Sequence, residues 1–227
     1  MTARYALYYA PEPAHPLWRA GCDWVGRDAE TGACTEAAAQ KDHLTAVPRR
    51  YGFHATMKAP FALTPGITVQ DLSGALVRYA RAQRAFEVPP LKVARLDDFL
   101  ALVPCAPEPR LTQIEREVVT QFDAFRAALT DAELAQRRRA RLDSVEEELL
   151  LRFGYPYVLQ RFRFHLSLTG SLAGIDEDIR IRVAADARKH FEPALSVPLA
   201  FDALCVFEEP ECGADFRLLN RVSFGAN

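Results

Sequence analysis

The sequence predicts a globular protein of mixed class, built from both β-strands and α-helices. Residues Arg4–Ala10 alternate large apolar side chains with a period of two, as in a half-buried strand. Apolar residues recur at helical spacing over Thr68–Arg84, and threonine is a favoured helix N-cap. Near the end of the chain, Leu199–Pro210 and Asp215–Phe224 have the pattern of an antiparallel hairpin.

Length and composition fit one ordinary domain. The chain has 227 residues, of which 49% are hydrophobic and 26% charged, so a core of normal size is available. We therefore expect residues 1–227 to form a single domain. The net charge is −2 and the pI about 6.2, which argues against a broad electropositive surface. No stable binding of duplex nucleic acid is expected.

The cysteines and the N-terminus favour a cytoplasmic protein. The five cysteines form no Cys-x-x-Cys pair, so neither a zinc ribbon nor a disulfide framework is indicated. The first residues, MTARYALYYAPEP, do not read as a signal peptide, since the apolar stretch is short and a proline follows it. No apolar run approaches the length that spans a bilayer, so no membrane association is expected.

The other elements are predicted in chain order. Pro48 is expected to introduce a strand over Arg49–Phe61, and Asp97-Asp98 to form the turn of a hairpin. Two helices are expected between Arg110 and Phe153, with a break near Thr130-Asp131. The hairpin with the Asp97-Asp98 turn is expected over Leu91–Pro104. A second long strand is expected over Tyr157–Gly170, and a last helix over about Asp176–Phe191. The basic run Gln136–Leu142 is interpreted as a solvated helix face without chemistry.

A repeated segment points to the function. RYGFHATMK at Arg50–Lys58 matches RFRFHLSLT at Arg161–Thr169 in its arginine, aromatic, phenylalanine, histidine and hydroxyl positions. The two histidines, His54 and His165, are 111 residues apart. We interpret the two segments as the same strand in two related halves of the chain.

Strand periodicity separates each segment into two faces. Phe53, Ala55 and Met57 fall on an apolar face, and the matching residues of the second segment do the same. The other face carries imidazoles, hydroxyls and cations without an acidic residue, which suits a phosphate. These residues are His54, Thr56 and Lys58 in the first segment and Arg163, His165 and Ser167 in the second.

The paired motifs His54-Ala55-Thr56-Met57 and His165-Leu166-Ser167-Leu168 resemble the two His-x-Thr/Ser-x motifs of the 2H phosphoesterase superfamily, which includes RNA ligase-like cyclic phosphodiesterases. The flanking sequences look more like a branch linked to phosphonate-utilisation operons. Ser167 stands where threonine is commoner, and it keeps the hydroxyl. The resemblance implies a two-lobed α+β fold of pseudo-two-fold duplicated antiparallel sheets, with interleaved strands, helices packed outside and the histidines in a central cleft.

The expected activity is that of a metal-independent phosphodiesterase with no cofactor. One imidazole would take a proton from the attacking hydroxyl or water, and the other would give a proton to the leaving oxygen. His54 and His165 are the predicted catalytic pair, and four residues are predicted to bind the substrate: Thr56, Ser167, Lys58 and Arg163. The expected substrate is a small nucleotide or ribose cyclic phosphate, or an RNA-derived cyclic phosphate.

Three other interpretations stay open. The chain could be a non-catalytic protein that binds a phosphate or an RNA end, although both histidines and both hydroxyls are retained. His54 and His165 could instead hold a metal, but no third carboxylate or thiolate is evident on the same strands. The acidic pI and the lack of an aromatic and basic RNA-binding pattern argue against a sequence-reading RNA-binding protein.

Overall fold

A computed structural model describes residues 3–35 and 42–225 of the chain, and these residues form an α+β structure, as the sequence predicts. Seven strands build one antiparallel sheet in the order β4-β5-β6-β2-β1-β8-β9, and β3 pairs with β7 in a second, small sheet. The strands are β1 (Arg4–Tyr9), β2 (Ala55–Ala62), β3 (Phe86–Val88), β4 (Leu91–Leu96), β5 (Phe99–Pro104), β6 (Leu166–Ser167), β7 (Leu199–Phe201), β8 (Ala203–Glu209) and β9 (Arg217–Ser223).

The large sheet consists of two parts that meet at one point. Strand β6 extends the β4–β5 hairpin, while β2, β1, β8 and β9 form the longer part. Between β2 and β6 the register contains a single pair, in which Ala55 lies opposite Leu166. Both side chains are buried. The two segments that repeat in the sequence are therefore adjacent at the centre of the sheet.

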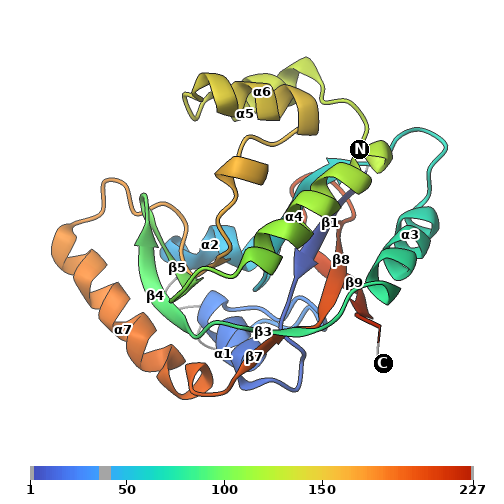
Figure 1. Cartoon of the computed structure of the whole chain (residues 1–227). Helices are drawn as coiled ribbons and strands as arrows, with labels where there is room; N and C mark the ends of the chain where they lie inside the picture. The colour runs from blue at the N-terminus through green and yellow to red at the C-terminus, as the bar shows by residue number, and fades with distance from the viewer. Residues whose placement is uncertain (1–2, 36–41, 226–227) are drawn as a thin grey trace.

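The helices pack around the sheet (Figure 1). Helix α7 packs on α1 and β4, α3 packs on β8 and β9, and α4 packs on β2. Helices α5 and α6 form a pair above the strands in Figure 1, connected by the Arg138–Glu147 ion pair. The helices are α1 (Pro16–Val25), α2 (Asp42–Tyr51), α3 (Val69–Arg81), α4 (Pro109–Gln121), α5 (Asp131–Arg138), α6 (Ser144–Phe153) and α7 (Glu177–Leu195), with short 3-10 turns η2 (Asp123–Phe125) and η3 (Leu159–Arg161).

Pro48 does not introduce a strand, contrary to the prediction; it lies inside α2. Proline has no N–H, so the carbonyl four residues earlier, that of Leu44, receives no helical hydrogen bond from it. Gly170 donates its N–H to this carbonyl at 2.8 Å instead. Because of the proline, the Leu44 carbonyl is free to bind Gly170, and this hydrogen bond joins α2 to the chain just beyond β6.

Both repeated strands are shorter than predicted, and each begins directly after its histidine. Gly52 has a φ of 78°, which breaks an extended chain before His54. In the second segment η3 occupies Leu159–Arg161, and the strand is only β6. The predicted apolar faces are nevertheless confirmed, because Phe53 and Phe164 are buried together with the apolar residues of β2 and β6.

The remaining predictions agree with the structure apart from one helix. Thr68 caps α3 through a capping box, and Asp97 lies in the β4–β5 turn with a φ of 51°. Thr130 caps α5 at the predicted break, but the segment up to Phe153 holds α4, α5 and α6 rather than two helices. Among the described residues, no helix combines the length and the apolar character that a membrane crossing requires.

Candidate active site

The single β2–β6 pair determines how the predicted catalytic residues lie. Ala55 lies opposite Leu166, each histidine is the residue directly before this pair, and Thr56 and Ser167 are the residues directly after it. All four are half-buried, on the face opposite to the buried Ala55 and Leu166. The two histidines thus flank the same strand pair, and the charge of His165 contributes to the lowered pKa of His54.

The His54 ring is held in one orientation. Its Nδ1 lies 2.9 Å from the carbonyl oxygen of Gly52, and a carbonyl can only accept, so Nδ1 carries the proton. The bare Nε2 then accepts from the Thr56 hydroxyl at 3.2 Å. Burial lowers the pKa of His54 to about 4, against the opposing effect of the Gly52 carbonyl, and the charge of nearby His165 adds to the lowering. His54 is therefore a neutral base at neutral pH.

The His165 ring repeats this arrangement. Its Nδ1 lies 2.7 Å from the carbonyl oxygen of Arg163, also two residues earlier, which leaves Nε2 free to exchange a proton with a substrate. Burial is the main cause that lowers the pKa of His165, and the guanidinium of Arg163 lowers it further. The carbonyl of Arg163 and the carboxylate of Asp97 oppose these effects. Both imidazoles thus present an unprotonated Nε2.

The segment before His165 is supported from α4. Leu159 has a φ of 52°, which is unusual for a residue with a side chain. Its N–H donates to both carboxylate oxygens of the buried Glu115, at 3.0 and 3.2 Å. This contact holds the turn from which the chain runs to Arg163 and His165.

Two hydroxyls accompany the histidines, as predicted. Thr56 Oγ1 is bonded to His54 in the absence of a ligand. The Ser167 hydroxyl makes no hydrogen bond to the part of the chain that the structure describes. Either hydroxyl can donate to a phosphate oxygen once a substrate is bound.

An aromatic wall, which the sequence interpretation missed, borders His54. Tyr8 of β1 stacks on the His54 ring at 3.6 Å between ring centroids, and the Phe207 ring lies 6.0 Å from His54. Tyr51, at the end of α2, is 6.4 Å away. Burial raises the pKa of Tyr8 well above its ordinary value, so this phenol stays protonated. Alternation within Arg4–Ala10 could have indicated Tyr8, because it lies on the strand face opposite to Tyr9.

Arg163 lies beside His165, where it was expected. Its guanidinium pairs with Asp97, and both side chains are more than half exposed, at 56% and 69%. An ion pair this exposed contributes only about 0–1 kcal/mol, so a phosphate can compete for the arginine. Arg163 is therefore available to a substrate.

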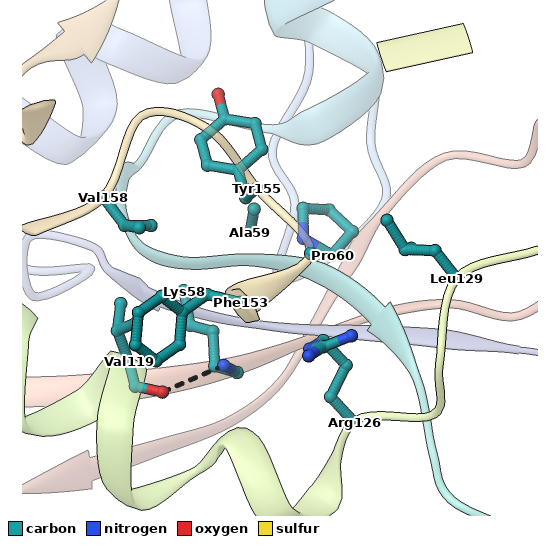
Figure 2. A pocket seen from close by; sticks show the side chains of 10 residues that line it. Lys58, Ala59, Pro60, Val119, Arg126, Leu129, Phe153, Tyr155 and Val158 are labelled. Atoms are coloured by element: carbon teal, nitrogen blue, oxygen red, sulfur yellow. Dashed lines mark hydrogen bonds between the residues drawn. The ribbon is translucent and has the colours of Figure 1, made fainter. Parts of the chain in front are cut away.

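Lys58 does not point freely into the site as the sequence suggested. Its ammonium is buried and donates to the carbonyl of Val119 at 3.1 Å, as Figure 2 shows. It also donates to Asp123 at 3.1 Å. Asp123 is shared with Arg126, whose guanidinium also reaches the carbonyl of Arg152 at the end of α6. Lys58 thus anchors the base of the α5–α6 pair, with no free charge for a phosphate.

A shift in strand register explains the position of Lys58. Tyr8 lies opposite Thr56, but the next register pair along β1 is Leu7 with Lys58. One residue of β2 is therefore extra, and such a bulge changes the direction of the side chains that follow it. Within residues 3–35 and 42–225, no three histidine, cysteine or acidic side chains gather as metal ligands would.

Comparison with known proteins gives two curated relatives of about twice this length. The chain is 40% identical over 232 aligned positions to ribose 1,5-bisphosphate phosphokinase PhnN of Janthinobacterium sp. (strain Marseille), covering 97% of this chain and 51% of that protein. It is 37% identical over 224 positions to the protein of the same name from Laribacter hongkongensis (strain HLHK9), covering 96% and 51%. The chain spans about half the length of these relatives.

Among solved structures, the fold is similar to Usb1 of Kluyveromyces marxianus, with a TM-score of 0.39 and 12% identity over 96% of this chain and 98% of that one. Residues 56–217 match the family described as protein of unknown function (DUF1045). The matched residues include β2 from its second residue onward, β6, and the hydroxyls Thr56 and Ser167. Because this match extends over most of the 227 residues, the protein belongs to the DUF1045 family.

Proposed function

We propose that this protein is a 2H-type phosphodiesterase that opens a small cyclic phosphodiester without a metal, and that it acts in phosphonate metabolism. The observation that carries the proposal is the matched pair of imidazoles. His54 and His165 each hold Nδ1 against a carbonyl two residues earlier and present an unprotonated Nε2, directly before two adjacent strands; Nε2 of His54 accepts from the Thr56 hydroxyl. A single structural histidine has no need of such a partner.

The proposed reaction needs only these groups. The base imidazole takes a proton from water at Nε2 while the water oxygen bonds to phosphorus. The P–O bond to one ring oxygen breaks, and the other imidazole, protonated at Nε2, gives that oxygen its proton. Thr56 and Ser167 donate to the non-bridging oxygens, where negative charge grows. The product is a phosphate monoester with a free hydroxyl.

The substrate class follows from size and from the relatives. The name of the relatives refers to ribose 1,5-bisphosphate, a small sugar phosphate. We therefore place ribose cyclic phosphates first among substrates, with nucleoside and RNA-end cyclic phosphates next. Two imidazoles that flank a single strand pair suit one phosphate of a small molecule.

The proposal is tested with a panel of substrates. Purified protein is incubated with ribose 1,2-cyclic phosphate, nucleoside 2′,3′-cyclic phosphates and short RNA with a 2′,3′-cyclic end, with and without EDTA. We expect hydrolysis of at least one compound at the same rate with the chelator. Binding without turnover of every compound would favour the non-catalytic alternative, and loss of activity in EDTA would favour the metal site. ATP-dependent phosphorylation of ribose 1,5-bisphosphate by this chain would contradict the proposal.

The activity should be highest in mildly acidic solution. A general base must be unprotonated, which requires a pH above its pKa, and a general acid must be protonated, which requires a pH below its pKa. With the pKa of His54 near 4 and that of His165 below its ordinary 6.5, kcat/KM should rise through about pH 4 and should already be falling at pH 6.5. On this falling side it should decrease about tenfold per pH unit as the acid loses its proton. The pH profile of kcat/KM has the same shape whichever histidine is the base and whichever is the acid. Both assignments require that the pair of histidines carries one proton. Measuring kcat/KM from pH 4 to 9 at constant ionic strength checks this, and a plateau up to pH 8 would contradict it.

A further inference from the structure

Arg137 on α5 is a cation without an acidic partner. It belongs to the basic run that the sequence suggested to be only a solvated helix face. Its neighbour Arg138 pairs with Glu147, and Arg139 is exposed. Arg137 is half-buried, with its guanidinium 5.4 Å from the centre of the Tyr155 ring. In the part of the chain that the structure describes, it forms no ion pair.

The residues around Arg137 belong to the region of the sheet near His54. Burial is the main cause that lowers its pKa, and the positive charge of Arg4 contributes, so the two guanidinium groups lie near each other. Arg4 is on β1, where it shares a face with Tyr8. Tyr8 stacks on His54. Tyr155, which Arg137 contacts, lines a small cavity with Lys58, Ala59 and Pro60 of β2, the strand that begins directly after His54 (Figure 2).

The charges around Arg137 leave a positive excess. Arg4 and Arg50 both pair with one buried carboxylate, that of Glu209. Glu133 is also near, but its carboxylate is engaged in the capping box at Thr130. Three guanidinium groups thus face two carboxylates, and the cation left over is the half-buried Arg137.

A hydrogen-bond donor lies beside this cation. The Tyr155 hydroxyl makes no hydrogen bond to any described residue, and it points away from Lys58 (Figure 2). Burial raises the pKa of Tyr155 to about 12, so the phenol is a neutral donor. An arginine and a tyrosine donor side by side, near a second arginine, are suited to the oxygens of a phosphate monoester.

We propose that Arg137 and Tyr155, with Arg4 nearby, bind a second phosphate group on the substrate, so that the substrate is a cyclic phosphodiester that also carries a phosphate monoester. This inference rests on the proposed function, since it adds a specificity site for the same substrate. The α5–α6 pair then selects the substrate, because Lys58, Asp123 and Arg126 anchor it over the sheet.

The test compares matched substrates that differ by one phosphate. Ribose 1,2-cyclic phosphate is compared with its 5-phosphorylated form, and adenosine 2′,3′-cyclic phosphate with its 5′-phosphorylated form. For the pair that is turned over, we expect kcat/KM to favour the doubly phosphorylated member, and Arg137→Ala to reduce that value by about 10- to 100-fold. The variant should change kcat/KM of the other member by less than about threefold. Arg139→Ala, which removes the same charge from an exposed position, should change neither value.

Two results would overturn the second phosphate site. One is equal turnover of both members by the unmodified protein, and the other is an equal loss on both members in Arg137→Ala. If neither pair is turned over, the wider panel decides the proposed function, and the second phosphate site is tested separately by calorimetric binding of ribose 5-phosphate. Binding that is lost in Arg137→Ala and kept in Arg139→Ala would support the site. Absent binding, or equal binding by the three proteins, would overturn it.

Discussion

Alanine at either His54 or His165 is expected to lower kcat by about 10²–10⁴-fold, the usual contribution of one general acid or base. The fold should survive, because both rings are half-buried on the polar face and neither belongs to the apolar core. Steady-state kinetics on the substrate that the panel identifies, with circular dichroism as a check of folding, measures both effects. His43→Ala provides the control, since His43 is exposed on α2. Activity close to that of the unmodified protein in either variant would remove that histidine from the mechanism.

The double variant is the sharper form of this experiment. If the two imidazoles act as one unit, removing the second costs much less than removing the first. We expect the double variant to have a kcat within about tenfold of the weaker single variant. Fully multiplicative losses would mean that the two rings act independently, which a shared phosphate does not permit.

Gly52→Ala should impair both stability and catalysis. A Cβ at this position would lie 2.6 Å from the Cβ of Ala29 in the buried interior, and the φ of 78° is unfavourable for alanine. Strain of about 1–2 kcal/mol together with overpacking of about 1–3 kcal/mol predicts a loss of about 2–5 kcal/mol in the free energy of unfolding. Any shift of residue 52 also moves the carbonyl that orients His54, and a misplacement of this kind can cost about 10²-fold in rate.

Gly66→Ala separates these causes. Gly66 has a φ of 87°, yet an added Cβ there meets no atom within 4 Å. This control should lose only the strain of about 1–2 kcal/mol and keep its kcat. Urea denaturation and kinetics on both variants make the comparison. If Gly52→Ala behaved like Gly66→Ala in both measurements, the contact with Ala29 and the orienting role of the carbonyl would both be wrong.

The correspondence of His54 and His165 was visible in the sequence because duplication leaves a repeat. His54 and His165 occupy the same place in two matched segments, and the alternation of Phe53 and Ala55 indicated which face is core. The class of fold was equally accessible, since the alternation in β1 and the capping residue of α3 are local signals. Local patterns of this kind need no knowledge of distant contacts.

The errors concern features that depend on the rest of the chain. Alternation cannot reveal the bulge that lets Lys58 reach Asp123, because the bulge is a property of the pairing between β1 and β2. Arg137 looked like its neighbours in a basic run, and only the packing of α5 brings it over Tyr155. Pro48 was misread because the carbonyl that it leaves free is satisfied by Gly170, which is distant in sequence.

The main-chain carbonyls of residues 52 and 163, which orient the two histidines, also determine which of these two positions can change its side chain. Both acceptors belong to the main chain, so a change of side chain at position 163 leaves the ring of His165 oriented. Position 52 is confined to glycine by its φ and by Ala29, whereas position 163 is exposed and can accept many residues. Descendants of this chain can therefore exchange the arginine at position 163 while the histidine orientation stays the same. On the proposed function, selection can change substrate recognition separately from the proton transfer.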